Sequence, residues 1–202
     1  DKTQNVDLRA FHIPCEIFMK PDVVQHFDLV RRVSVACKFT QCEVFSYTDN
    51  ITEKLSQIVL TDDSKALPLS HYLTIHSYLG ANSRLLLAAR SILANVLTCL
   101  YQLHKCGVIM RTLSPTNVLL NAQFGQIRIG NLFDCQTSSI YVPLPKPFAD
   151  PSNPFLPPEY YYEPMSEYTS AFDIWQFGIL LLYVITGFQP VSYGSELIKH
   201  VS

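Results

Sequence analysis

The fold of this 202-residue chain is decided by the stretch Met110-Arg111-Thr112-Leu113-Ser114-Pro115-Thr116-Asn117. Residues 84–105 precede it, and their apolar side chains recur at the spacing of an amphipathic helix. That apolar stripe consists of Ile92, Val96, Leu100 and Leu103. Gly107 then follows, and glycine suits a helix end because it readily adopts a left-handed conformation. The stretch is therefore predicted to be a loop directly after a long helix.

The residues after this loop predict two short strands and a second, buried helix. Residues 118–120 and 127–129 are apolar runs on either side of a polar turn. Residues 169–186 are largely apolar and precede Gly187, which indicates a buried helix that ends there. Residues 141–158 contain seven prolines, so this segment is not expected to form regular structure.

The N-terminal part of the chain predicts a small region of mixed structure. Residues 13–19 favour a strand, and residues 21–39 carry apolar side chains at helical spacing. Residues 43–47 and 57–60 favour two further strands, separated by a polar stretch that is typical of a hairpin. We expect a turn at residues 61–64, which separates this region from the remainder of the chain.

Composition and charge give no reason to expect nucleic acid or an anionic membrane surface as a partner. The chain is 48% hydrophobic and 16% charged, with a formal net charge of -2. A nearly neutral chain has no electrostatic reason to bind nucleic acid or an anionic membrane surface. The longest apolar run, residues 177–188, is too short to cross a bilayer. We therefore expect no nucleic-acid partner and no membrane span.

The cysteines and histidines do not have the spacing of metal ligands. The chain has six cysteines, none in a Cys-x-x-Cys pair, and most lie in apolar segments. We interpret them as reduced thiols of a cytoplasmic protein, with a disulfide or a zinc site as the alternative. The six histidines include no His-Glu-x-x-His motif, so no metal-binding residue is predicted.

The stretch 110–117 resembles the catalytic loop of the protein kinase family, which reads His-Arg-Asp-Leu-x-x-x-Asn. Arginine, leucine, proline and asparagine stand where the family has them. Three further resemblances follow in the family's order: residues 125–133 resemble the hairpin that leads into Asp-Phe-Gly, residues 157–159 resemble Ala-Pro-Glu, and residues 173–178 resemble Asp-x-Trp-x-x-Gly. One such motif is weak evidence, whereas four in order are specific.

The resemblance implies a protein kinase-like, two-lobe α+β fold. Residues 1–61 would form a reduced N-lobe-like region, and residues 62–202 a mainly helical, partial C-lobe. Three residues occupy structural positions of the family. Asp173 would accept hydrogen bonds from backbone amides of the loop, and Trp175 would pack in the core. Glu159 stands where the family has a glutamate that pairs with an arginine further along the domain.

The side chains that perform phosphoryl transfer in the family are replaced here. Met110 and Thr112 stand in place of the histidine and the aspartate, and a threonine hydroxyl cannot act as a general base near neutral pH. Ser114 replaces the lysine that contacts the transferred phosphate. Asn131 replaces the aspartate that binds Mg²⁺, and a neutral amide is a weaker ligand for a hard cation than a carboxylate is. We interpret these as degraded active-site positions.

The nucleotide-binding features of the family are missing as well. No Gly-x-Gly-x-x-Gly occurs anywhere in the chain. The best alignment of the strand that carries the family's lysine places Glu16 at that position. We therefore do not expect ATP binding, and we expect no cofactor.

Two residues of the loop that match the family admit two interpretations each. Asn117 is either the retained metal ligand or a residue that packs the loop through backbone hydrogen bonds. We favour packing, because no acidic co-ligand accompanies it. Arg111 is either a structural arginine, which we favour, or a partner for a phosphate on Thr137, Ser138, Ser139 or Tyr141.

The resemblance with these replacements predicts a pseudokinase domain. It would act as a non-catalytic protein-interaction or scaffolding module within a larger protein or assembly. Tyr160, Tyr161 and Tyr162 follow the Pro-rich segment and either bind a protein partner or pack on the chain's own C-lobe. The alternatives are a divergent active kinase that uses Asn117 and Asn131, and a pseudokinase that binds ATP without transferring phosphate.

Overall fold

The computed structural model describes the backbone in nine ranges: residues 8–14, 42–48, 55–62, 66–77, 83–121, 126–130, 135–137, 153–162 and 168–187. The predicted helix at 21–39 and the positions of Glu16 and Asn131 lie outside these ranges. So do residues 141–152 of the Pro-rich segment. Residues 153–158 contain turns and no helix or strand.

The N-terminal region forms a three-stranded antiparallel sheet. Its strands are β1 (Leu8–Pro14), β2 (Cys42–Thr48) and β3 (Leu55–Asp62), in the order β1-β3-β2. Phe45 pairs with Ile58 between β2 and β3, which confirms the predicted hairpin. The strand predicted at 13–19 starts earlier, since β1 begins at Leu8 and residues 15–19 lie outside the described ranges. The residues 61 and 62 predicted as a turn still belong to β3.

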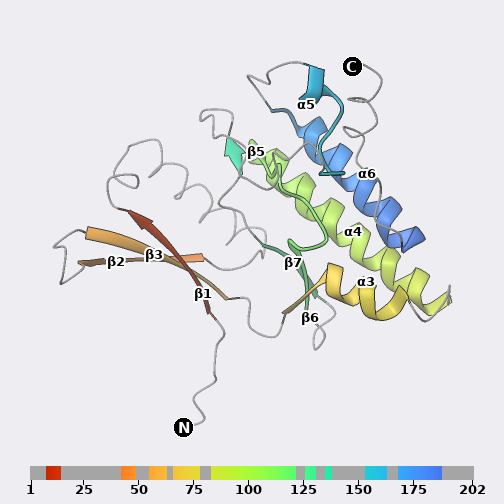
Figure 1. Ribbon diagram of the computed structural model, residues 1–202, viewed down its shortest axis with the longest axis horizontal. Coiled ribbons are helices and arrows are strands. Elements are labelled where there is room, and N and C mark those ends of the chain that lie inside the picture. The colour runs from red at the N-terminus through yellow and green to blue at the C-terminus, as the bar shows by residue number, and fades with distance from the viewer. Residues whose placement is uncertain are drawn as a thin grey trace, which may run out of the picture.

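The second region is built around two helices, α4 and α6, which pack against each other. Figure 1 shows them side by side, with the three-stranded sheet well away from them. The elements in chain order are β4 (Ala66–Pro68), α3 (Leu69–Ser77), α4 (Ser83–Lys105), β5 (Val108–Ile109), β6 (Val118–Asn121), β7 (Gln126–Ile129), β8 (Gln136–Thr137), α5 (Glu159–Tyr162) and α6 (Ser170–Thr186). The long helix, the two strands after the loop and the helix before Gly187 are thus confirmed. That last helix was predicted to be buried, and α6 is buried on one face only.

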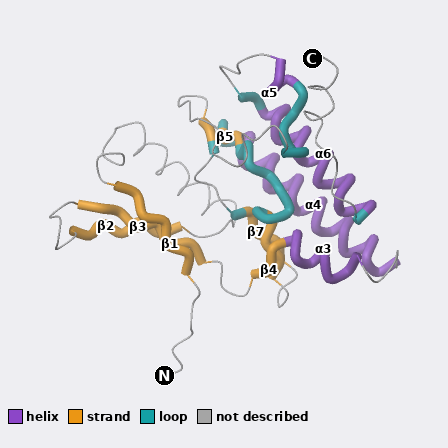
Figure 2. The backbone as a smooth tube through the Cα atoms, viewed as in Figure 1, coloured by secondary structure: helices purple, strands orange, loops and turns teal. Residues whose placement is uncertain are grey.

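Two small sheets position the loop between α4 and β6. One has the order β4-β6-β7, and the other pairs β5 with β8. Both are antiparallel, with Leu120 opposite Ile127 and Ile109 opposite Gln136. Figure 2 shows these short strands between the helices and the three-stranded sheet. The loop at 110–117 is therefore anchored at both ends by strand pairing.

The core lies between α3, α4, the loop and α6. Along α4 the predicted stripe is confirmed: Val96, Leu100 and Leu103 are buried, and Ile92 packs against them while remaining partly exposed. α6 contributes Leu180 and Val184 to this core. The apolar face of each helix is buried against the other, which is the main source of helix stability in a folded protein.

The ends of both helices have the expected glycine geometry. Gly107 follows α4 with φ 71°, and Gly187 follows α6 with φ 72°. The Gly187 amide donates to the Tyr183 carbonyl at 2.9 Å, which satisfies one of the last free carbonyls of α6. A side chain with a Cβ is strained in this conformation, so glycine is favoured here.

The structure tests the expectations about cysteine thiols and membrane spans for the described residues only. Cys99, Cys106 and Cys135 are thiols rather than disulfides, and the structure describes no other cysteine side chain. Within the described ranges, no helix has both the length and the apolar character needed to cross a membrane.

Replacing Leu100 by alanine should cost much more stability than replacing Leu97. Both residues lie on α4, but Leu100 is 1% exposed and Leu97 is 42% exposed. Leu100→Ala leaves a cavity in the core and should lower the free energy of unfolding by about 2–5 kcal/mol. Leu97→Ala should cost less than about 1 kcal/mol. Urea unfolding followed by circular dichroism measures both, and equal losses would contradict the described core.

Candidate functional site

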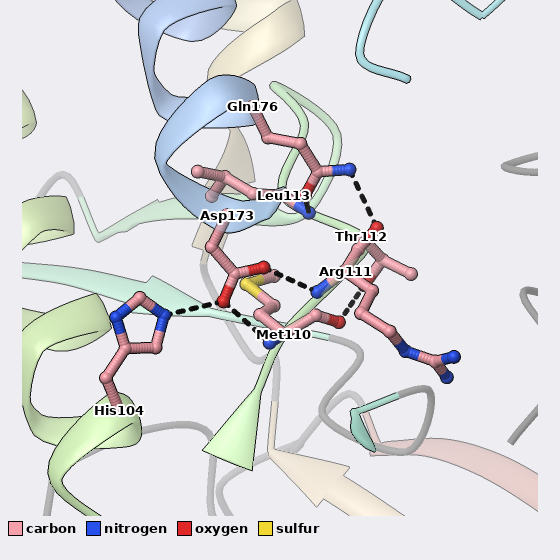
Figure 3. A network of polar contacts seen from close by, with 7 residues as sticks. All are labelled: His104, Met110, Arg111, Thr112, Leu113, Asp173 and Gln176. Carbon is pink, nitrogen blue, oxygen red and sulfur yellow. Dashed lines mark hydrogen bonds and ion pairs between the residues drawn. The ribbon is translucent and has the colours of Figure 1, made fainter. Parts of the chain in front are cut away.

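The loop at 110–117 is the site where the sequence predicted degraded catalytic positions. Six active-site positions of the family were considered, and five of them lie in this loop: Met110, Thr112 and Ser114, where the residue is replaced, and Arg111 and Asn117, where it matches the family. The sixth, Asn131, lies outside the described ranges. Two side chains of α6, Asp173 and Gln176, bind the loop, and His104 of α4 contacts Asp173 (Figure 3).

Asp173 connects α6 to the start of the loop. Its carboxylate is fully buried and accepts hydrogen bonds from the Met110 amide at 2.8 Å and the Arg111 amide at 2.7 Å. His104, near the end of α4, contacts the same carboxylate through Nε2 at 2.8 Å. A buried carboxylate is costly unless hydrogen bonds replace its lost hydration. Asp173 therefore ties α4, the loop and α6 together, which is the geometry that a structural role requires.

Gln176 holds the loop one helical turn further along α6. It is fully buried; its Oε1 accepts from the Leu113 amide at 2.9 Å, and its Nε2 donates to the Arg111 carbonyl at 2.7 Å. Residues three apart on a helix lie on the same face, so Asp173 and Gln176 reach the loop together. Together they engage the backbone of three loop residues, Met110, Arg111 and Leu113.

The Arg111 backbone lies in the left-handed region, with φ 61°. Such a conformation is uncommon for a residue with a side chain, and it persists only where the surroundings fix it. Here Asp173 binds the amide of Arg111 and Gln176 binds its carbonyl. The two α6 side chains thus account for the unusual conformation.

The side chains in place of the family's histidine and aspartate are both buried. Met110 has no exposed surface and belongs to the hydrophobic core. Thr112 has none either, and its hydroxyl donates to the Met110 carbonyl at 3.5 Å, the long limit of a hydrogen bond. Neither position therefore offers a polar side-chain atom to a substrate.

The polar side chains that follow are engaged within the loop. The Asn117 side chain donates from Nδ2 to the Thr112 carbonyl at 2.7 Å. The backbone carbonyl of Asn117 accepts from the Gly130 amide at 2.8 Å. Ser114 Oγ and Thr116 Oγ1 share a hydrogen bond of 2.8 Å. These contacts correspond to the packing interpretation of Asn117, which closes the loop onto itself.

The remaining predicted residues lie on α5 and α6. Glu159 begins α5 and is exposed, while Tyr160 packs against the small cluster of Leu156, Tyr168 and Phe172. Tyr161 and Tyr162 belong to α5, but their side chains lie outside the description. Trp175 is partly buried on α6, and its place in the core stays a prediction. The described residues include no group of three or more histidine, cysteine or acidic side chains that could hold a metal ion.

Comparison with known families decides the family of this chain. The sequence model of the family described as protein kinase domain matches residues 17–201. The chain belongs to the protein kinase domain family. Its fold is the protein kinase-like fold, since the solved structure of the Cydia pomonella granulovirus kinase PK-1 matches it with a TM-score of 0.66. That match is 14% identical and covers 98% of this chain and 67% of the viral one.

Curated relatives of this kinase domain are much longer proteins. Serine/threonine-protein kinase RAD53 of Saccharomyces cerevisiae is 22% identical over 194 residues, which is 90% of this chain and 23% of that protein. Protein kinase C-like 1 of the same yeast is 35% identical over 103 residues, 51% of this chain and 9% of that protein. The chain therefore spans less than a quarter of the length of either relative.

Two residues of the hydrogen-bonded group that holds the loop, Gln176 and His104, could not be identified from the sequence. Gln176 stands in an almost wholly apolar helix, three residues after Asp173, and an isolated amide at that spacing was the available signal. His104 lies near the end of α4, and 69 residues separate it from its partner Asp173. No local pattern in the sequence indicates so distant a partner.

Gln176→Ala should destabilise the domain strongly, because it leaves two buried backbone groups without their partner. Each unsatisfied buried group costs about 1–3 kcal/mol, so for two groups we expect a loss of roughly 2–6 kcal/mol in the free energy of unfolding. Asn95→Ala is the matched control, since Asn95 is exposed on α4 and donates only to the Ser91 carbonyl. That control should change stability by about 0.5 kcal/mol or less. Similar values for both variants in urea unfolding would contradict the bridging role of Gln176.

Proposed function

We propose that this kinase domain is a pseudokinase that acts as a non-catalytic protein-interaction or scaffolding module. The observation that carries the proposal is the burial of Thr112, which occupies the position of the family's catalytic aspartate and has no exposed surface. Phosphoryl transfer in this family requires a group there that accepts the proton of the substrate hydroxyl. A buried threonine hydroxyl directed at a backbone carbonyl does not provide one.

The neighbouring contacts support the same proposal. The Asn117 amide group donates to the loop's own backbone, and the Ser114 hydroxyl is bonded to Thr116. Met110 has replaced a polar residue and is now part of the core. The described side chains at 110, 112, 114 and 117 therefore serve the packing of the loop, which is what a domain retained for its shape requires.

Exposed apolar side chains on α6 support an interaction role. Ile174, Leu182 and Ile185 are 51%, 49% and 57% exposed, and they recur at helical spacing. A helix that is apolar around its circumference is normally covered on all sides, so this face suits a protein partner. The proposed setting is a larger protein or assembly in the cytoplasm.

The competing proposal is a kinase that is active or that binds ATP without transferring phosphate. It is favoured by the relatives, whose names describe them as kinases. In that case Mg²⁺ and ATP would bind with the help of Asn117 and Asn131. The two proposals differ in what nucleotide does to the stability of the folded chain.

Thermal unfolding with and without millimolar ATP, at zero and ten millimolar Mg²⁺, separates these proposals. We expect no shift of the midpoint in any condition, because no ATP binding is expected. A ligand at a hundredfold excess over its dissociation constant would stabilise the fold by about 2.7 kcal/mol, a shift of several degrees. Tripolyphosphate at equal ionic strength is the control for general anion binding. A Mg²⁺-dependent shift that ATP causes and tripolyphosphate does not would contradict the proposal. A radiolabel transfer assay would then distinguish an active kinase from a domain that only binds ATP.

A further inference from the structure

Arg111 is the largest fully buried side chain in the described part of the chain. Its Nη1 donates to the Gln136 Oε1 at 3.3 Å, and its guanidinium carbon lies 4.9 Å from the centre of the Tyr168 ring. Figure 3 shows the side chain extending away from Asp173 and Gln176, which bind only its backbone. The charged end of Arg111 therefore contacts Gln136 and Tyr168, and neither of these residues binds the loop backbone as Asp173 and Gln176 do.

These contacts join three parts of the chain that are far apart in sequence. Gln136 belongs to β8, which pairs with β5 directly before the loop. Tyr168 lies two residues before α6 and packs edge-on against Phe172 with ring centres 5.1 Å apart. Arg111 thus holds the segment after β7 and the segment before α6 against the catalytic loop.

The direction of the Arg111 side chain is fixed by its backbone. Asp173 and Gln176 hold both peptide groups of Arg111, so the direction in which its side chain leaves the backbone is set, and the contacts with Gln136 and Tyr168 place the charged end. An arginine is charged at all accessible pH values, and its planar group both donates hydrogen bonds and stacks on aromatic rings. Gln136 accepts a hydrogen bond at the edge of the guanidinium, and the Tyr168 ring lies against its face.

We infer that Arg111 holds Gln136 and Tyr168 in place without a phosphate on residues 137–141. The Arg111 side chain is fully buried, with the Gln136 amide at its edge and the Tyr168 ring at its face, so a phosphate could reach it only by displacing groups that already cover it. The arrangement around the loop is then the same whether or not the chain is phosphorylated. The inference concerns the conformation of the domain and does not depend on the absence of catalysis.

Hydrogen exchange followed by mass spectrometry tests this inference on the whole 202-residue chain. Intact mass first confirms that the protein carries no phosphate. We expect the peptide containing β8 to be protected in this unphosphorylated chain, and Arg111→Lys to speed its exchange at least tenfold, because lysine lacks the planar group. Arg90→Lys is the matched control, since Arg90 is exposed on α4 and should leave that exchange unchanged.

A second pair of variants tests the contact from the other side and covers the case in which Arg111→Lys fails to fold. Gln136→Leu removes the acceptor for Arg111 and should speed exchange at β8 at least tenfold. Gln136→Glu keeps an acceptor and adds a negative charge, so exchange should remain as slow as in the unchanged chain or become slower. Equal exchange in Gln136→Leu and Gln136→Glu would overturn the inference.

Acidic substitutions test the independence from phosphate directly. Ser138→Glu with Ser139→Glu places negative charge on the segment where a phosphate would lie. We expect the exchange of β8 to stay within threefold of that in the unchanged chain. A slowing of tenfold or more that disappears when Arg111→Lys is added would show that Arg111 receives an anion, and would overturn the inference. Rapid exchange of β8 in the unphosphorylated chain would do so as well.

Discussion

The hydrogen bonds from the Met110 and Arg111 amides to Asp173 are the interaction on which the rest of the site depends. Successive amides of an extended strand point to opposite sides, so two of them can bind one carboxylate only where the backbone leaves that course, as it does at Arg111. The carboxylate is fully buried, so losing either donor would leave charge without compensation in the core. The buried charge on α6 therefore fixes the conformation of the loop and, through it, the direction of the Arg111 side chain.

The contact between Asp173 and the loop could be predicted because the resemblance to the protein kinase family implies it: the family's aspartate at this position accepts hydrogen bonds from backbone amides of the loop. The loop stretch and the Asp-x-Trp-x-x-Gly stretch stand in the family's order, separated by strands and a helix that periodicity also predicts. Gln176 could not be predicted in the same way, since the resemblance says nothing about that position. Its role becomes visible only in the folded structure, where α6 lies against the loop and Gln176 binds the Leu113 amide and the Arg111 carbonyl.

Other details depend on contacts that no local pattern carries. Tyr160 was open to either binding a partner or packing internally, and its packing near Tyr168 and Phe172 became visible only in three dimensions. Trp175 was expected in the core from the family resemblance, and the structure shows it partly buried on α6. The face of a helix that becomes buried is decided by its neighbours, which a single sequence does not supply.

Membership in the protein kinase domain family and the capacity for phosphoryl transfer rest on different atoms of the same loop. The fold holds the loop through its backbone groups, which Asp173 and Gln176 bind regardless of the side chains at 110, 112 and 114. The chemistry of the family depends on those side chains. A methionine at 110 even adds apolar surface to the core, which favours burial of the loop over exposure of a reactive group. Because the two sets of atoms are separable, the fold can persist unchanged while the catalytic groups are replaced, and the fold by itself does not decide the function.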